Sequence, residues 1–230
     1  MNIFTSNWAA DSAKQNYNVS CDRVKVVPFG ANVSMLQTQE GRTSSIMLKS
    51  KNCCKLLFLG VDWERKGGEK AIEITKSLRK QGVNTELHIA GSGVAHELHD
   101  YIINHGYLKK NTAEGKEKLD QLLRQSHFLL LPTIADCVPV VIAEANSYSL
   151  PVITNNVGGI ASAVENGVNG WAFSPNEKPK VYAEKIKNYF NNKEIYSELA
   201  LSSFEFSKAY LNWDKSGKKV RGIFKELGLI

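Results

Sequence analysis

The sequence of 230 residues has few features that would anchor it in a membrane, cross-link it or bind a metal ion. It contains no run of 18 consecutive apolar residues, which argues against a membrane-spanning helix. Its first residues lack a basic start followed by an apolar stretch, so they do not resemble a signal peptide. The four cysteines have neither CxxC spacing nor the density of a disulfide scaffold. These absences predict a protein of the reducing cytoplasm.

The charge balance is basic, with a formal net charge of +6. A basic protein favours acidic partners such as phosphates, nucleotides or an anionic membrane surface. Much of the excess lies in residues 208–225, where a solvated helix face is a sufficient explanation. The sequence has no RNA-recognition motif, zinc-finger spacing or basic strand with interleaved aromatic residues, so we expect no nucleic-acid partner.

The central part of the chain alternates short apolar runs with glycine-containing turns and amphipathic stretches. Short, uniformly apolar strands alternating with helices are typical of a parallel sheet covered on both faces. The predicted fold class is therefore α/β, a Rossmann-like doubly wound parallel sheet with at least four central strands. The expected strands are 55–60, 85–91, 127–132 and 151–154, and the expected helices are 66–82, 96–103, 114–125 and 140–148.

The two ends of the chain have different patterns. Residues 1–17 read as a helix capped by Ser6, and residues 24–30 read as a strand that leads into a turn. Residues 34–52 are polar and without periodicity, which is typical of a linker or loop. Beyond Pro175 the chain is predicted to be helical, with two amphipathic stripes and a last helix that starts near residue 213.

The loop that begins at Gly60 carries two adjacent cations, Arg65 and Lys66, before Gly67. Cations beside a helix N-terminus are unfavourable for the helix dipole unless an anion such as a diphosphate binds there. The plainer interpretation is a solvated Arg-Lys pair in a turn. The GxxxxGK[ST] frame is missing, which excludes a P-loop.

The loop that begins at Gly91 resembles part of a dinucleotide-binding fingerprint, because Gly91 and Gly93 form a GxG pair. His96 occupies the place of the third glycine, which argues against an NAD site. A tight turn beside a nucleotide remains compatible with this pattern.

The loop that begins at Pro132 contains the clearest pattern, in which Glu144 follows Asp136 by eight residues. Pro139 suits the first turn of a helix, whose amides near 137–140 lack helical partners and face the positive end of the dipole. Asp136 at the rim and Glu144 two turns into the helix could contact one elongated ligand. Alternatively, Asp136 is only a capping or loop acid and Glu144 a solvated helix residue.

The loop that begins at Thr154 contains Gly158 and Gly159, which open a short helix whose amides could bind a phosphate. Farther along, the NGVNG turn looks structural, because its glycines allow a positive φ before a strand begins at Trp171.

Together these motifs resemble the donor-site signature of retaining GT-B glycosyltransferases, specifically glycosyltransferase family 4, also called glycosyl transferases group 1. In that family an acid, seven residues and a second acid run into EA-small-x-x-G-x-PV and then GG-x-x-E-x-V-x-x-G-x-x-G. The corresponding segments here are DCVPVVIAEANSYSLPVIT and GGIASAVENGVNGWAF. FLGVDWERKGG and VKVVPFGAN also resemble family segments in the expected order, so the resemblance covers nearly the whole chain.

The resemblance implies hexosyl transfer from a nucleotide-diphosphate sugar to a saccharide or lipid-linked acceptor, in cell-surface polysaccharide or lipopolysaccharide synthesis. Asp136 would contact hydroxyls of the donor sugar, Glu144 the ribose hydroxyls, and Lys66 the diphosphate leaving group. Such electrostatic stabilisation requires no metal ion or other cofactor. The expected donor-binding residues are Gly60, Arg65, Lys66, Gly67, Gly91, Gly93, Cys137, Val138, Pro139, Val140, Glu144, Gly158 and Gly159.

The sequence departs from the family pattern in three respects. The first acid is Asp136 where glutamate is commoner, and the usual GFG after it is Cys137-Val138-Pro139. The family often has a basic residue just after the first strand, where this sequence has Val61. Diphosphate binding would therefore depend more on Arg65 and Lys66.

The family has two Rossmann-like domains, of which the acceptor domain comes first. The expected organisation is a remnant of that missing acceptor domain (1–33), a linker (34–52), a nucleotide-sugar donor-binding domain (53–205) and a C-terminal helix (206–230). Alone, such a chain is expected to bind a nucleotide sugar but to transfer poorly. Its basic last helix suggests peripheral contact with the inner face of a membrane.

Other function classes remain open from the sequence. The chain could be a non-catalytic module that binds nucleotide sugars, or another GT-B enzyme such as a sugar-nucleotide epimerase or a phosphorylase. A Rossmann oxidoreductase is disfavoured by the incomplete glycine fingerprint. His127, at the start of a predicted strand, is expected to have a structural role.

Overall fold

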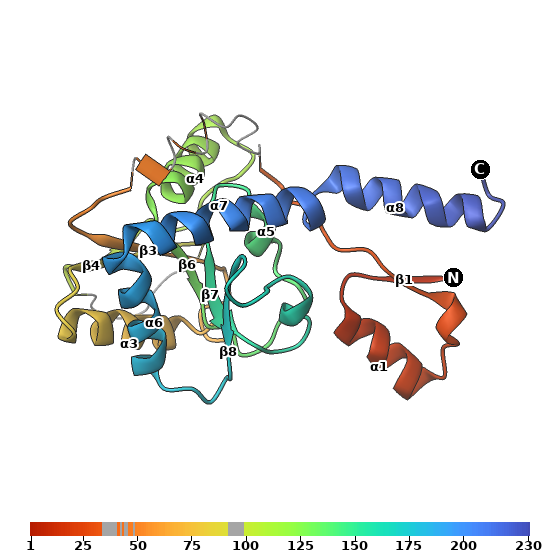
Figure 1. Ribbon diagram of the computed structural model, residues 1–230, viewed down its shortest axis with the longest axis horizontal. Coiled ribbons are helices and arrows are strands. Elements are labelled where there is room, and N and C mark those ends of the chain that lie inside the picture. Colours follow the sequence, from red (N-terminus) through yellow and green to blue (C-terminus); the bar gives the residue numbers. More distant parts are fainter. Residues whose placement is uncertain (34–40, 42, 44–45, 48, 92–98) are drawn as a thin grey trace.

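A computed structural model describes residues 1–33, 41, 43, 46–47, 49–91 and 99–230. Its main body is a six-stranded sheet with the order β5-β4-β3-β6-β7-β8, in which all neighbouring strands are parallel (Figure 1). Counted from β3, this is the 3-2-1-4-5-6 order of a doubly wound Rossmann-like fold, as predicted. The strands are β3 (Cys54–Leu59), β4 (Thr85–Ala90), β5 (Ile102–Asn104), β6 (Phe128–Leu131), β7 (Val152–Asn155) and β8 (Gly170–Phe173).

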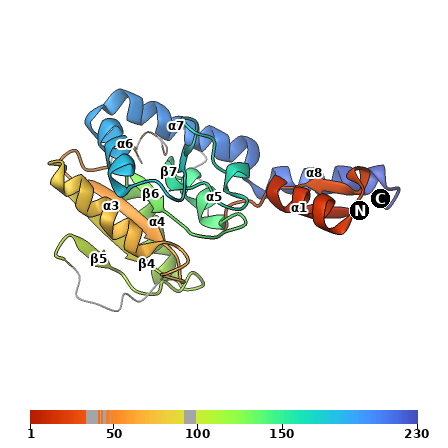
Figure 2. The same ribbon diagram turned by 90° about the horizontal axis from the view of Figure 1, so that it is seen from below.

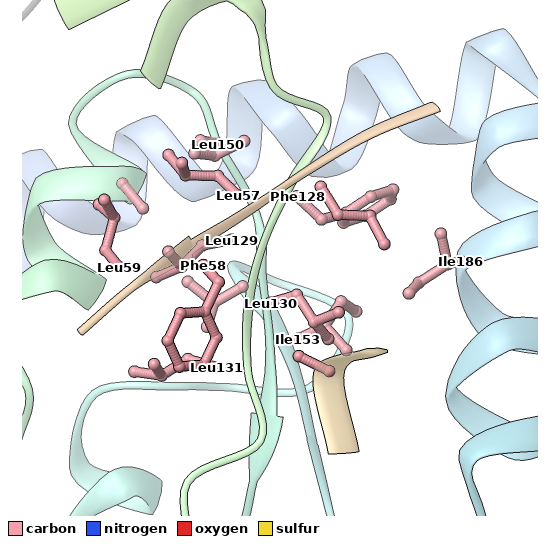
Figure 3. Packing of buried hydrophobic residues seen from close by; sticks show 14 of the residues in the cluster. Leu57, Phe58, Leu59, Phe128, Leu129, Leu130, Leu131, Leu150, Ile153 and Ile186 are labelled. Carbon is pink, nitrogen blue, oxygen red and sulfur yellow. The ribbon is translucent and has the colours of Figure 1, made fainter. Parts of the chain in front are cut away.

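The central strands are buried on both faces, which explains their uniformly apolar sequences. Every residue of β6 and β7 is buried, and the core also receives Leu150 and Ile186 from flanking segments (Figure 3). Burying each such aliphatic or aromatic side chain stabilises the fold by roughly 1.5–3 kcal/mol.

Five helices that the structure describes from end to end accompany the sheet, and a side chain caps the amino-terminal end of two of them. Thr112 accepts a hydrogen bond from the amide of Gly115, and Asn192 accepts one from the amide of Ile195. α3 packs against α6, and α7 contacts both α5 and α6 (Figure 2). These helices are α3 (Gly68–Lys80), α4 (Ala113–Gln125), α5 (Val140–Asn146), α6 (Pro179–Asn191) and α7 (Lys193–Tyr210).

The two ends of the chain meet beside the main body. β1 (Asn2–Phe4), α1 (Asn7–Tyr17) and β2 (Val24–Val26) form a small unit with a two-stranded parallel sheet. The last helix, α8 (Trp213–Glu226), lies at the same end of the molecule (Figures 1 and 2). The Ser216 hydroxyl donates to the Pro28 carbonyl at 2.6 Å, which ties α8 to the segment after β2. Within the described ranges, no helix is long and apolar enough to cross a bilayer.

Three predicted elements are wrong where the structure describes them. Residues 2–4 form β1 instead of extending the first helix, which begins only after its cap, Ser6. The helix expected over 96–103 is absent from 99–103, where the β-branched Ile102 and Ile103 begin β5 and pair with β4. Residues 41, 43, 46 and 47 of the expected linker are helical instead of forming a loop. Residues 34–40, 42, 44–45, 48 and 92–98 lie outside the described residues.

Candidate functional site

The carboxyl edge of the sheet brings together three charged side chains from two loops that are far apart in the sequence. The Lys66 ammonium group makes a hydrogen-bonded ion pair with the Asp136 carboxylate. The Arg65 guanidinium group lies 3.5 Å from the same carboxylate oxygen and donates to the Ala135 carbonyl at 3.0 Å. Lys66 and Asp136 expose only 14% and 12% of their side chains, so their attraction is weakly screened. Lys66 therefore pairs directly with Asp136. Arg65 instead lies between this carboxylate and that of Asp62, to which its Nε atom donates at 2.9 Å.

Backbone contacts fix the relative positions of the loops after β3 and β6. The Ile134 amide donates to the Arg65 carbonyl at 2.8 Å, and the Thr133 hydroxyl donates to that same oxygen at 3.0 Å. Gly67, with φ = 78°, leaves no room for a side chain, because a Cβ atom would lie 2.0 Å from the Pro132 carbonyl oxygen. Close packing of these two loops sets the distance between Lys66 and Asp136.

The loop after β7 also packs on the Asp136 segment. The Gly159 amide donates to the Asp136 carbonyl at 3.2 Å, so it is not aimed at an exterior anion as the sequence predicted. The short helix expected here is a single 3-10 turn, Ile160–Ser162. Gly158 adopts φ = 53°, and a Cβ atom on it would lie 1.9 Å from the Asp136 carbonyl oxygen. These glycines therefore support the Asp136 backbone.

Glu144, on α5, belongs to a second charged cluster that sequence analysis found only in part. Its side chain is 1% exposed, and the Lys110 Nζ atom lies 3.0 and 2.8 Å from its two carboxylate oxygens. The interpretation of Glu144 as a solvated helix residue is therefore wrong. Sequence analysis missed Lys110, although an acid surrounded by apolar neighbours required a cationic or hydrogen-bonding partner.

The segment between β1 and α1 contributes residues that the sequence did not assign to the site. The Cys137 sulfur lies 3.6 Å from the Thr5 and Ser6 hydroxyl oxygens, and the Asn7 amide donates to the Ser162 hydroxyl at 3.0 Å. The N-terminal unit thus contacts the loops after β6 and β7.

The remaining expected donor-binding residues have mostly backbone roles. Gly60 donates to the Ala90 carbonyl at 3.1 Å, while Gly91 adopts φ = 100° and donates to the Gly106 carbonyl at 2.8 Å. Val138 is half-buried, and Pro139 occupies the cap position of α5, immediately before Val140. Gly93 lies outside the described residues.

We expect Lys66 and Arg65 to differ in their contributions to stability. Lys66→Met should lower the free energy of unfolding by about 1–2 kcal/mol, because it leaves a poorly solvated carboxylate with one distant cation. Arg65→Met should cost less than about 1 kcal/mol, because the arginine is more exposed and lies farther from Asp136. Urea denaturation of both variants measures the difference; equal losses would contradict the assigned geometry.

No group of three or more histidine, cysteine, aspartate or glutamate residues that could hold a metal ion occurs in the described part of the chain. The arrangement instead suits an anionic ligand, because Arg65 and Lys66 carry several N–H donors at the carboxyl edge of the sheet.

Comparison with known proteins matches residues 44–203 to the family described as Glycosyl transferases group 1. The chain is 28% identical over 174 residues to an uncharacterized glycosyltransferase of Methanocaldococcus jannaschii, covering 74% of this chain and 48% of the relative. It is 24% identical over 220 residues to the lipopolysaccharide glucosyltransferase WaaG of Escherichia coli, covering 85% and 58%. The chain spans about half the length of the curated relatives it matches.

Solved structures share the fold at low sequence identity. The crystal structure of a glycosyltransferase from Rickettsia africae has a TM-score of 0.76 at 17% identity, with 97% of this chain and 62% of that chain covered. The structure of Anabaena HepE in complex with UDP and glucose has a TM-score of 0.72 at 15% identity, with 97% and 62% covered.

Proposed function

Because the chain belongs to the glycosyl transferases group 1 family, we propose that it is the donor-binding half of a retaining glycosyltransferase of family 4. It would bind a nucleotide-diphosphate sugar, and the complete enzyme would transfer the hexosyl group to a saccharide or lipid-linked acceptor. The observation that carries this proposal is the convergence of Lys66 and Arg65 on Asp136 at the carboxyl edge of the sheet.

The charged side chains of this cluster could act on both the leaving group and the sugar during such a transfer. Lys66 and Arg65 would neutralise the diphosphate as the bond to the sugar breaks and negative charge develops on the leaving group. Asp136 would lie beside the sugar and stabilise positive charge at the anomeric carbon, which has oxocarbenium character in glycosyl transfer. This ion pair holds the Asp136 carboxylate and the Lys66 ammonium group in position before a ligand binds. The residues themselves supply this chemistry, so the proposal includes no metal ion or other cofactor.

Glu144 and Lys110 would hold the nucleoside part of the donor. The Glu144 carboxylate is held in place by Lys110, which bonds both of its oxygens, and because it is only 1% exposed it would accept hydrogen bonds from ribose hydroxyls once Lys110 moves aside. Lys110, whose side chain is 49% exposed, would add positive charge on the solvent side of the same carboxylate.

We infer the binding partners from the family and from the share of each relative's length that this chain matches. An acceptor domain would complete the enzyme, because the chain matches about half the length of those relatives. Similarity to a lipopolysaccharide glucosyltransferase supports a role in cell-surface polysaccharide synthesis. The HepE structure contains UDP and glucose, which supports UDP as the first nucleotide to test.

Calorimetric titration with UDP, GDP and ADP tests the proposal. We expect one nucleotide to bind, and Lys66→Met and Glu144→Gln to weaken it about 10- to 100-fold through loss of charged hydrogen bonds. Asp136→Ala should leave the affinity for the bare nucleotide nearly unchanged and weaken that for the nucleotide sugar. Lys76→Met removes an exposed lysine of α3 and provides the matched control.

Two outcomes would contradict this assignment. Folded wild-type protein that binds no nucleotide, either alone or together with an acceptor domain, would remove the basis for a donor site. Equal losses from Lys66→Met and Lys76→Met would show that binding depends on overall charge and not on the cluster at Asp136.

A further inference from the structure

A cavity of about 300 Å³ lies at the amino-terminal edge of the sheet, opposite the edge that carries the candidate donor site. It is bounded by the segment before β3, by the residue that precedes β6 and by the junction of α6 and α7. The lining includes Ile46, Met47, Lys49, His127, Phe190 and Tyr196. Nothing in the proposed donor chemistry uses these residues.

Lys49 is the unusual residue of this cavity, because its side chain is buried with only 6% of the residue exposed. Its Nζ atom donates to the Tyr196 hydroxyl oxygen at 2.9 Å and to the Ser149 carbonyl oxygen at 3.2 Å. An ammonium group has three N–H donors, whereas a neutral amine has two and a lone pair. The two acceptors therefore match the neutral amine and leave its lone pair unused.

Among the described residues, no carboxylate makes an ion pair or hydrogen bond with Lys49. Burial raises the pKa of the neighbouring Tyr196 well above its usual value, and this hydroxyl donates its proton to the His127 carbonyl at 3.0 Å. Burial lowers the pKa of Lys49 to about 7. At neutral pH a large fraction of this lysine is thus a nucleophilic amine.

Neighbouring groups define what could approach this amine. His127 is neutral and uses both ring nitrogens, accepting from the Lys55 amide at 3.0 Å and bonding the Ser50 carbonyl at 2.9 Å. The thiol of Cys54 interacts electrostatically with Tyr196, and burial raises the pKa of this thiol, which keeps it neutral. Lys51 and Lys193 also line the cavity and are exposed, so positive charge surrounds its mouth.

We propose that Lys49 is a covalent site for small aldehydes that carry a phosphate or carboxylate group. The apolar part of the lining, Ile46, Met47 and Phe190, favours a product without charge at the nitrogen. The exposed lysines at the mouth favour an anionic group on the incoming molecule. The lone pair of Lys49 attacks the carbonyl carbon, forming a C–N bond, while the carbonyl oxygen takes up a proton. That proton comes from the amine, and loss of the oxygen as water together with the second amine proton leaves a C=N bond and requires no oxidant or reductant.

Labelling with pyridoxal 5′-phosphate at pH 7.5, followed by borohydride reduction and peptide mass spectrometry, tests this site in the intact chain. Lys49 should be labelled at least about tenfold faster than the exposed lysines, because an ordinary lysine with a pKa near 10.4 is almost fully protonated at this pH. Its labelling rate should level off above about pH 7. Lys49→Met should lose this rapid labelling and retain the slow background.

Two further measurements complete the test. Uncharged pyridoxal should label Lys49 several-fold more slowly than the phosphorylated form, and Lys51→Met with Lys193→Met should remove this difference. Labelling of Lys49 no faster than that of exposed lysines, or only after unfolding in urea, would overturn the proposal. Equal rates for the two aldehydes on wild-type protein would overturn the preference for an anionic group.

Discussion

Gly158→Ala is expected to lower the free energy of unfolding by more than about 3 kcal/mol, because two independent costs add at this position. The residue has φ = 53°, a conformation that costs an L-residue about 1–2 kcal/mol. In addition, the new Cβ atom would lie 1.9 Å from the Asp136 carbonyl oxygen, so one of two backbone segments must move. That movement would also disturb the hydrogen bond from the Gly159 amide to Asp136.

Gly82→Ala is the matched control for Gly158→Ala. Gly82 has φ = 81°, but no atom lies within 4 Å of the position that its Cβ would take. It should therefore show the conformational cost alone, about 1–2 kcal/mol. Urea denaturation of both variants separates the two costs. If the two variants lose the same stability, the loops after β6 and β7 do not approach as closely as described.

The second large effect expected is a loss of stability in acid that depends on His127. Burial, and then the positive charge of Lys49, lower the pKa of His127 from its ordinary 6.5 to about 3. Between these two values the unfolded chain binds a proton that the folded chain does not. Folding stability therefore declines as the pH falls from 6.5 towards 3, by roughly 1.4 kcal/mol per unit and roughly 4–5 kcal/mol in total.

The geometry explains why this histidine resists protonation. Its Nδ1 atom accepts from the Lys55 amide, so a proton on Nδ1 would break that bond and place two N–H groups face to face. Denaturation of His127→Asn between pH 6.5 and 4.5 should give a flatter dependence of stability on pH than wild type, whatever its stability at neutral pH. The exposed His99→Gln is the control and should keep the wild-type slope. A wild-type slope in His127→Asn would contradict this assignment.

Most of the main sheet could be predicted because burial on both faces leaves a direct signature in the sequence. β3, β6 and β7 are short apolar runs with no polar alternation, and the helical stripes of α3 and α4 recur at helical spacing. β5 was missed because a strand of three residues at the sheet's edge contains too little pattern to reveal its period. β1 was missed for the same reason.

Part of the candidate site was also recognisable from the sequence. Asp136, Glu144 and Lys66 stand in a spacing that resembles a known donor signature, and their positions after strands place them at one edge of the sheet. Their roles in binding a donor remain predictions. The partner of Glu144, Lys110, carries no local signal, since one lysine in a lysine-rich loop resembles any solvated residue.

Local pattern thus accounts for the class of fold, the order of most elements and the edge at which a ligand would bind, because periodicity and spacing act between residues close together in the chain. Tertiary structure alone decided the Lys66–Asp136 and Lys110–Glu144 pairs, the contact of Ser6 with Cys137 and the burial of Lys49. Each depends on atoms brought together from distant segments, where close packing determines distance, solvation and hydrogen-bond partners. Sequence spacing carries little information about those quantities.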